Sequence, residues 1–186
     1  CGIAGLHLYG RREYYSNIMG RHSYYDVRAS EIPRAVHRDT VDLLTTFEAE
    51  TLARHILAVG KGGGLVYTAT DANVPLEKIT FLDARLVHDL AAYLKERDLP
   101  ATTAGLLEDA HTRGVQCFEV NFDDIVAQLA ERLEIPQTSA ARTRNTLAVA
   151  VSTALLDFRR DFVKKALERT WPGRQKIIDL NVKAVE

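Results

Sequence analysis

The chain alternates short runs of β-forming residues with longer stretches that have the apolar periodicity of an amphipathic helix. Asp42 to Phe47 is typical of a buried strand, and in the helical pattern that follows it Leu52 and Ile56 fall on one side. Such alternation is typical of a parallel sheet covered by helices. We therefore predict an α/β fold, a Rossmann-like three-layer domain with a mostly parallel sheet. Further strands of this sheet are predicted at Leu65–Thr68, Ile79–Leu82 and Val115–Val120.

Residues that begin or end helices support this division of the chain. A helix predicted over Thr102–Arg113 is followed by Gly114, which suits the left-handed position beyond a helix C-terminus. Asn121 is the predicted N-cap of the next helix. A final long helical pattern runs from Thr143 through Phe162 and stops before Pro172. With no repeat or long linker in between, residues 1–186 are predicted to form a single domain.

The front of the chain departs from the doubly wound pattern. Two strands are predicted there, Leu6–Tyr9 and Ser23–Ser30, the second with one solvated face. A doubly wound fold normally begins with a strand and a glycine-rich turn, and both are missing. The only methionine is Met19. We therefore expect the sequence to be a fragment of a longer subunit.

Composition excludes several classes of protein. With 186 residues, 46% hydrophobic and 26% charged, the chain suits one soluble domain with a sizeable core. Its net charge of −1 argues against a general polyanion binder, which usually carries a basic excess. No apolar run approaches the roughly 20 residues of a membrane span, and no secretory signal begins the sequence. A cytoplasmic protein is expected.

Cysteine and histidine usage argues against a metal centre within the chain. Cys1 and Cys117 are too few to supply the four thiolates of a typical iron–sulfur cluster. Cys117 lies in a predicted strand and is interpreted as a small buried side chain. The histidines show no paired metal-ligand spacing. We therefore predict no metal site and no catalytic residue in this chain.

Residues 9–28 are the most unusual segment. They hold five of the seven tyrosines together with four arginines. Core strands favour aliphatic residues and ordinary loops favour Gly, Asn, Ser and Pro, so this composition fits neither. Tyr and Arg are enriched where a large partner is bound, and Arg offers a planar fork of donors to phosphates and carboxylates. The segment is predicted to be a binding surface.

The glycine-rich run at residues 60–64 is a weaker candidate. A phosphate-binding loop leads from a strand into a helix and ends in Lys followed by Ser or Thr. Here Gly60 to Gly64 follow a predicted helix and precede a predicted strand. A helix-to-strand turn is the favoured interpretation.

Four segments carry a resemblance to a known family. They are YGRREYYSNIMGRHSYYDVRAS, DLLTTFEAETLARH, RNTLAVAVSTALLDF and IIDLNVKAVE. Together they resemble the γ-type domain of 2-oxoacid:ferredoxin oxidoreductases, in the form fused to the front of the α subunit. The resemblance extends over nearly the whole chain. Family members usually open with a GxGGQG-like turn, which is absent from this sequence.

The resemblance implies a reaction in which a 2-oxoacid, coenzyme A and oxidised ferredoxin give acyl-CoA, carbon dioxide and reduced ferredoxin. Cofactors supply the difficult chemistry in such enzymes. Thiamine diphosphate and a [4Fe–4S] cluster are expected to be held by other chains or domains, with coenzyme A as co-substrate. The expected partners are the α-type domain, the β subunit and ferredoxin. Alone, the chain is expected to be inactive.

The same resemblance gives the tyrosine- and arginine-rich segment a specific hypothesis. Its arginines could bond the phosphates of coenzyme A, and its smaller polar residues could bond the pantetheine amides or a neighbouring domain. The other interpretation is a subunit interface, with tyrosines buried against another chain and arginines paired to its carboxylates. The candidate residues for either role are Arg11, Arg12, Asn17, Arg21, His22 and Ser23.

A function from a different class also remains open. The chain could be a free-standing Rossmann-like module whose basic aromatic segment holds a nucleotide or a short single-stranded nucleic acid. Its near-neutral charge weighs against this alternative. Within the family interpretation, the fused type of segment favours 2-oxoglutarate or a broad range of 2-oxoacids as substrate.

Overall fold

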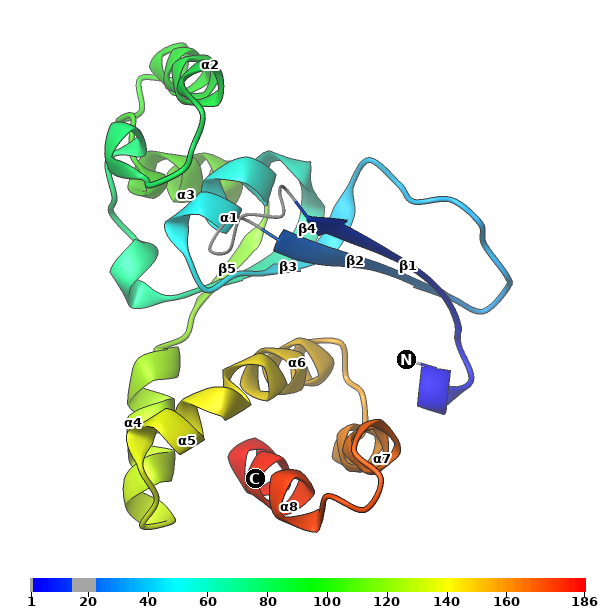
Figure 1. Ribbon diagram of the computed structural model, residues 1–186. Coiled ribbons are helices and arrows are strands. Elements are labelled where there is room, and N and C mark those ends of the chain that lie inside the picture. The colour runs from blue at the N-terminus through cyan, green and yellow to red at the C-terminus, as the bar shows by residue number, and fades with distance from the viewer. Residues whose placement is uncertain (1, 15–22) are drawn as a thin grey trace. The chain divides into compact units, whose positions relative to one another are not determined.

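A computed structural model describes residues 2–14 and 23–186 of the protein (Figure 1). Their contacts divide the chain into two compact units. One unit spans His7–Val120, and the other combines Cys1–Leu6 with Asn121–Glu186. The prediction that residues 1–186 form a single domain stays a prediction.

The first unit contains a parallel sheet with the strand order β3-β4-β5. Its strands are β3 (Val41–Thr45), β4 (Val59–Tyr67) and β5 (Gln116–Glu119). The connections between them run through α1 (Ala49–His55), α2 (Ala84–Lys95) and α3 (Thr103–Thr112). The predicted α/β, Rossmann-like class with a parallel sheet is confirmed, and Gly114 takes the expected left-handed conformation beyond α3 (φ 82°). Short 3₁₀ segments in this unit are η2 (Ile56–Ala58), η3 (Ala69–Asp71) and η4 (Leu76–Lys78), and the other unit contains η1 (Gly2–Ala4) and η5 (Ala141–Thr143).

The core of this unit lies between the sheet and its helices. Leu52 of α1 is fully buried, as the predicted apolar stripe required. It packs in one cluster with buried residues from β4 and from the other two helices, among them Leu65, Leu94 and Leu106. Cys117 of β5 is half-buried against the same cluster, and burial raises the pKa of its thiol.

The buried carboxylate of Asp109 and its partner Arg113 connect α3 to the residues at the start of β4 and just before it. Asp109 accepts hydrogen bonds from Tyr93 Oη at 3.1 Å and Arg113 Nε at 2.8 Å, and Arg97 Nε lies 3.3 Å from it. The guanidinium of Arg113 also donates to the backbone carbonyls of Val59 and Ile56, at 2.8 and 3.1 Å. Five donors in one planar group allow Arg to bridge acceptors in this way.

The glycine-rich run corrects one sequence prediction. Gly60 to Gly64 do not form a helix-to-strand turn but lie inside β4, where the pairing with β3 shifts register between Val41 and Leu43. The bulge needs glycine because Gly62 has a φ of 80°, and a Cβ on Gly63 would approach the carbonyl oxygen of Gly60. The pattern resembled a turn because a bulge and a turn demand the same residue.

A second prediction, the strand over Ile79–Leu82, is also wrong. The segment follows η4 and contains Phe81 in a left-handed conformation (φ 67°), which a regular strand does not contain. Arg54 Nη2 of α1 donates to the carbonyl of Phe81 at 2.9 Å and so supports this conformation. A short apolar run alone does not distinguish a strand from an irregular segment.

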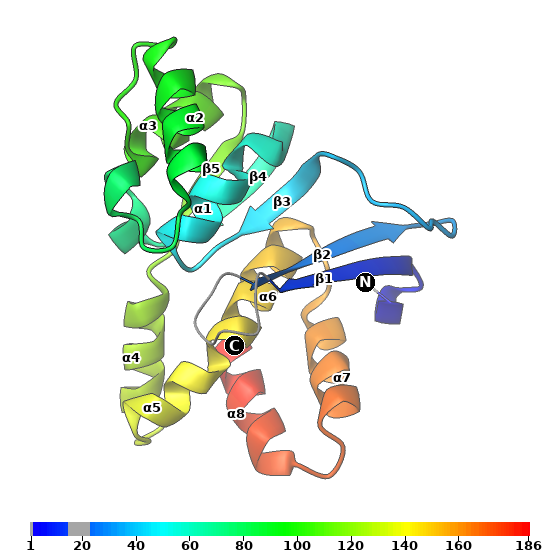
Figure 2. The same cartoon turned by 45° about the horizontal axis from the view of Figure 1, so that its top comes forward.

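The same unit carries a separate antiparallel hairpin, β1 (His7–Tyr14) and β2 (Ser23–Ser30) (Figure 2). The prediction for β2 is confirmed, including its alternation of half-buried and exposed side chains. The first strand is longer than the predicted Leu6–Tyr9. Its extension passes through charged residues that a sequence pattern does not assign to a strand.

The second unit is helical. Its helices are α4 (Phe122–Arg132), α5 (Gln137–Ala140), α6 (Arg144–Leu155), α7 (Arg160–Thr170) and α8 (Gln175–Val185). Asn121 caps α4 as predicted, since its Oδ1 accepts from Asp124 N at 3.2 Å. The long helix predicted from Thr143 through Phe162 is instead two helices. Asp157 takes a left-handed conformation (φ 54°), and Phe158 N closes the end of α6 by donating to the carbonyl of Thr153 at 2.8 Å.

Two of the segments that carried the family resemblance meet inside this unit. Thr146 of α6 donates its hydroxyl to Oδ1 of Asn181 in α8, and Asn181 Nδ2 donates to the carbonyl of Ile177 at 2.8 Å. A second cluster joins α7 to α8 through buried apolar residues, namely Val163, Leu167 and Ile178.

Candidate functional site

The strands of the hairpin contain the described part of the tyrosine- and arginine-rich segment. Strands β1 and β2 pair from His7 opposite Ser30 to Tyr14 opposite Ser23. Because side chains alternate across a strand, the pairing places Arg11 and Arg12 on opposite faces of the hairpin. We call the face with Arg11 the inner face and the face with Arg12 the outer face.

Arg11 is already paired within the chain. Its Nη2 lies 3.0 Å from Oδ2 of Asp26, which is opposite it on β2, and its Nε lies 3.3 Å from Oε1 of Glu13. The hydrogen bond with Asp26 raises the pKa of the guanidinium. An arginine with two carboxylate partners is a poor candidate for a phosphate ligand, because a phosphate would compete with both.

Aromatic contacts anchor the inner face to the rest of its unit. The ring centroid of Tyr24 lies 4.5 Å from that of His55 in α1, in an edge-on arrangement. The ring of Tyr9 lies 4.7 Å from that of His37. Arg28 Nη1 donates to the carbonyl of Val36 at 2.8 Å. The inner face is therefore used for folding.

The six predicted site residues divide into two groups. Arg11, Arg12 and Ser23 lie on the paired strands, where Arg12 is opposite Tyr25 and Ser23 begins β2. Asn17, Arg21 and His22 belong to the connection between the strands and lie outside the described residues. The roles of all six in binding stay predictions.

The carboxyl edge of the parallel sheet, where open α/β sheets bind ligands, carries negative charge. Glu48 precedes α1, and Asp71 ends η3 just after β4. The Asp71 carboxylate accepts a hydrogen bond from the backbone N–H of Ala49, in the first turn of α1. Burial, and secondly the charge of Glu48, raises the pKa of Asp71, whose Oδ2 is buried with no hydrogen-bond partner among the described residues.

This edge is unsuited to a nucleotide phosphate. A Rossmann-type site places the phosphate on the free N–H groups at the N-terminus of a helix that follows a strand. Here the carboxylate of Asp71 already accepts a hydrogen bond from an N–H group in the first turn of α1, and Glu48 adds a second negative charge. The sequence analysis missed Asp71, although a carboxylate just after a predicted strand is a recognisable signal.

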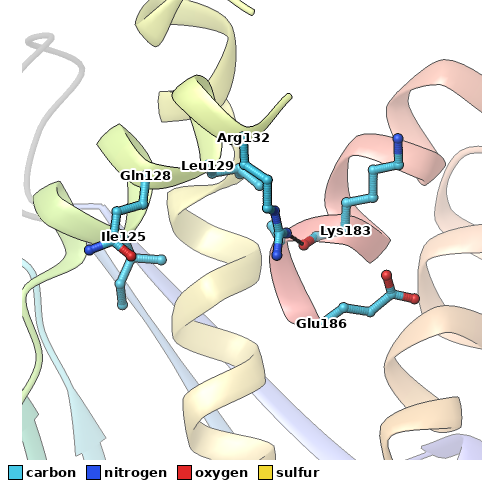
Figure 3. A pocket seen from close by; sticks show the side chains of 7 residues that line it. Ile125, Gln128, Leu129, Arg132, Lys183 and Glu186 are labelled. Atoms are coloured by element: carbon cyan, nitrogen blue, oxygen red, sulfur yellow. Dashed lines mark hydrogen bonds between the residues drawn. The ribbon is translucent and has the colours of Figure 1, made fainter. Parts of the chain in front are cut away.

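A shallow pocket lies in the helical unit between α4 and the end of α8 (Figure 3). Its volume is about 190 Å³. Arg132 Nη2 closes one side by donating to the carbonyl of Lys183 at 2.6 Å. Pockets for drug-sized ligands hold about 300–1,000 Å³, so this pocket is too small for coenzyme A.

The described residues contain neither a cluster of metal-binding side chains nor a membrane-spanning helix. Residues 2–14 and 23–186 contain no group of three or more His, Cys, Asp or Glu side chains that could hold a metal ion. Within the same ranges, no helix is both long and apolar enough to cross a bilayer.

Comparison with known proteins identifies the family. Residues 1–186 match the family described as pyruvate ferredoxin/flavodoxin oxidoreductase. The chain belongs to this family. The family that the sequence resembled is thereby confirmed.

Curated relatives of this chain are α subunits of 2-oxoacid:ferredoxin oxidoreductases. The subunit from Saccharolobus solfataricus is 29% identical over 175 residues, covering 94% of this chain and 27% of the relative. The α subunit of enzyme 2 from Aeropyrum pernix is 29% identical over 184 residues, covering 98% of this chain and 28% of the relative. The chain therefore spans about a quarter of the length of these relatives.

A solved structure shares the fold. It is the 2-oxoglutarate:ferredoxin oxidoreductase from Magnetococcus marinus, with 2-oxoglutarate, coenzyme A and succinyl-CoA bound. The match has a TM-score of 0.60 and 18% identity, and covers 98% of this chain and 25% of that one.

Proposed function

We propose that this chain is one part of a 2-oxoacid:ferredoxin oxidoreductase, which decarboxylates a 2-oxoacid oxidatively with coenzyme A to give acyl-CoA, carbon dioxide and reduced ferredoxin. The family match over residues 1–186 is the observation that carries this proposal. The substrate is 2-oxoglutarate or a broad range of 2-oxoacids. The chain works with an α-type domain and a β subunit, and ferredoxin accepts the electrons.

The resident cofactors belong to other parts of the enzyme. Thiamine diphosphate supplies the decarboxylation chemistry and a [4Fe–4S] cluster supplies the electron transfer. A cluster does not fit this chain, because Cys117 is the only cysteine among the described residues and is half-buried in β5. Negative charge at the carboxyl edge of the sheet also disfavours a nucleotide there. The chain's contribution is to pack on the α and β parts and to help cover the coenzyme A site.

Within that role, the tyrosine- and arginine-rich segment is a candidate either for contact with coenzyme A or for an interface with another subunit. Arg11 pairs with Asp26 and Glu13, so a phosphate would compete with both carboxylates, and Arg21 is the arginine to test first. Replacing Arg21 with Ala in the complete enzyme is expected to raise the apparent KM for coenzyme A. An unchanged KM with weaker subunit association would assign Arg21 to an interface instead.

The first test of the proposed function is an assay of the complete natural enzyme. Coenzyme-A-dependent reduction of ferredoxin, or of a viologen in its place, is measured with 2-oxoglutarate, pyruvate and branched 2-oxoacids. Reduction that requires both coenzyme A and an oxoacid supports the proposal, and the relative kcat/KM values identify the substrate. An intact complex without such activity, which instead binds nucleotides or single-stranded nucleic acid, would favour the free-standing module.

A further inference from the structure

Positive charge is concentrated on α7 and on the turn that leads into α8. Residues 159–176 contain seven Arg and Lys side chains and two carboxylates, although the chain as a whole has a net charge of −1. All seven cations are exposed. We call them the basic surface, and they are Arg159, Arg160, Lys164, Lys165, Arg169, Arg174 and Lys176.

The basic surface lies on a packed pair of helices. Val163 and Leu167 of α7 pack with Ile178 of α8, and Figures 1 and 2 show the two helices side by side. Gly173 takes a left-handed conformation (φ 76°) in the turn between them. The first residues of α8 therefore lie at the same end of the pair as the last residues of α7. An α-helix of this length extends over about 16 Å, which is long enough to contact a protein surface.

Most of these cations are unpaired among the described residues. Asp161 accepts from two of them, since Arg159 Nε lies 2.9 Å from its Oδ1 and Lys165 Nζ lies 3.1 Å from its Oδ2. The hydrogen bonds from Lys165 and Arg159 lower the pKa of Asp161. Five other cations form no side-chain hydrogen bond or ion pair within residues 2–14 and 23–186, namely Arg160, Lys164, Arg169, Arg174 and Lys176.

The same surface lacks the residues of a permanent interface. None of the exposed large apolar side chains of the described residues lies between residues 159 and 176. Permanent interfaces between subunits are largely apolar, whereas complexes of electron-transfer proteins are small and weak. Charge complementarity mainly raises the rate of association. The basic surface therefore favours an acidic protein that binds and leaves.

Nucleic acid and a small phosphate fit this surface less well. Single-stranded nucleic acid is bound by stacking on aromatic rings, but Phe162 and Trp171 are partly buried here. The chain also lacks the basic excess of nucleic-acid-binding domains. None of the seven cations lines the pocket between α4 and α8, so they do not enclose a site for a small anion.

We infer that the basic surface docks the acceptor ferredoxin through acidic side chains of that protein. This inference rests on the proposed function and deepens it, because it assigns the acceptor a surface on this chain. Among the partners in that function, ferredoxin is the protein that associates and dissociates in every turnover. The α-type domain and the β subunit are permanent partners, and they contact other surfaces. An acidic surface is therefore expected on the ferredoxin.

Steady-state kinetics of the complete enzyme test the inference. Lys164→Glu combined with Arg169→Glu reverses two unpaired cations of α7. At low ionic strength this variant is expected to raise the KM for ferredoxin at least about tenfold, without a comparable change in the KM for coenzyme A. Lys164→Arg combined with Arg169→Lys keeps both charges and is the matched control, with a KM for ferredoxin within about twofold of the wild type. Equal KM values for ferredoxin in the two variants would overturn the docking surface.

A second variant keeps the test independent of any damage to α7. Arg174→Glu combined with Lys176→Glu changes the start of α8, where negative charge suits the helix dipole. It is expected to raise the KM for ferredoxin as well. Increasing NaCl from about 50 to about 300 mM should lower the wild-type kcat/KM for ferredoxin and reduce the difference between the wild type and both reversed variants. A wild-type kcat/KM that does not change with salt would contradict the inference.

A viologen separates this inference from the proposed function. Its reduction, dependent on a 2-oxoacid and coenzyme A, is measured for the wild type and each variant. A wild-type enzyme without that activity rejects the proposed function. Viologen reduction with an unchanged KM for ferredoxin in both reversed variants rejects the docking surface alone. Loss of a subunit from the reversed variants in size-exclusion chromatography would assign the basic surface to a permanent interface, and loss of binding to single-stranded DNA with an unchanged KM for ferredoxin would assign it to nucleic acid. Either result overturns the inference.

Discussion

The hydroxyl of Thr146 lies 2.5 Å from Oδ1 of Asn181, and both side chains are almost fully buried. This hydrogen bond joins α6 to α8, the helices formed by two of the segments that carried the family resemblance. A buried amide without its partner costs free energy, so the pair specifies how the two helices pack. The residues that make the helical unit recognisable in sequence thus help to hold it together.

Thr146→Val is expected to destabilise the protein by about 1–3 kcal/mol, because the isosteric side chain leaves Asn181 Oδ1 buried without a donor. Urea unfolding followed by circular dichroism measures the change. Thr146→Ser, which keeps the hydroxyl, is the matched control and is expected to lose less stability than Thr146→Val. The reverse order would mean that packing of the methyl group, and not the hydrogen bond, makes the contact important.

Even the conservative replacement of Arg113 by Lys is expected to destabilise the protein. Lys keeps the charge near Asp109 but cannot also reach the carbonyls of Val59 and Ile56, so Arg113→Lys should cost about 1–3 kcal/mol. Arg113→Met should cost more, roughly 3 kcal/mol or above, because it removes a charged partner of a buried carboxylate. The exposed Arg85, replaced by Lys, serves as control and should change stability by no more than about 0.5 kcal/mol.

Sequence periodicity predicted the helices and strands that depend mainly on their own residues, and it missed those that depend on pairing with another segment. Strand β2 was predicted at Ser23–Ser30 because charged residues alternate there with β-forming residues, although the charged Asp26 and Arg28 lie on the half-buried face and the apolar Val27 on the exposed one. The extension of β1 through Arg11 and Glu13 was missed, since those charges are accommodated by pairing with β2. The break between α6 and α7 was missed because Asp157, and not Gly or Pro, takes the left-handed conformation.

The candidate site was predictable in composition but not in arrangement. Tyrosine and arginine content identified the segment, whereas the register that places Arg11 against Asp26 and Arg12 beside Tyr25 depends on the pairing of the two strands. A shift by one residue would exchange the two faces. The negative edge of the sheet was hidden for a similar reason, because Glu48 and Asp71 are separated in sequence and meet only at α1.

Gly105→Ala is expected to destabilise the protein although it raises helix propensity. A Cβ at this buried position of α3 would overlap the carbonyl oxygen of Pro100, which is backbone and cannot rotate away. Overpacking typically costs about 1–3 kcal/mol against a propensity gain of about 1 kcal/mol, so a net loss is expected. Ala104→Gly measures the propensity effect in the same helix. A stabilised Gly105→Ala variant would show that the segment before α3 moves freely.

Asp71 is expected to make stability depend on pH. Its pKa is raised in the folded protein by burial and by Glu48, so the folded state binds a proton more readily than the unfolded state. Ionisation therefore lowers stability as pH rises through the interval between the unfolded and folded pKa values, and the loss persists above it. Asp71→Asn removes this charge and keeps an oxygen that can accept from Ala49 N–H. The variant should have the higher Tm at pH 7.

The difference between Asp71→Asn and the wild type should shrink as pH falls below the unfolded pKa of about 3.9, where Asp71 is protonated in both states. Thermal unfolding between pH 7 and pH 3 measures it. Asp89→Asn, on the exposed surface of α2, is the control and should show no comparable gain at pH 7. A lower Tm for Asp71→Asn at pH 7 would mean that the hydrogen bond from Ala49 N–H to the ionised carboxylate outweighs the cost of burying the charge.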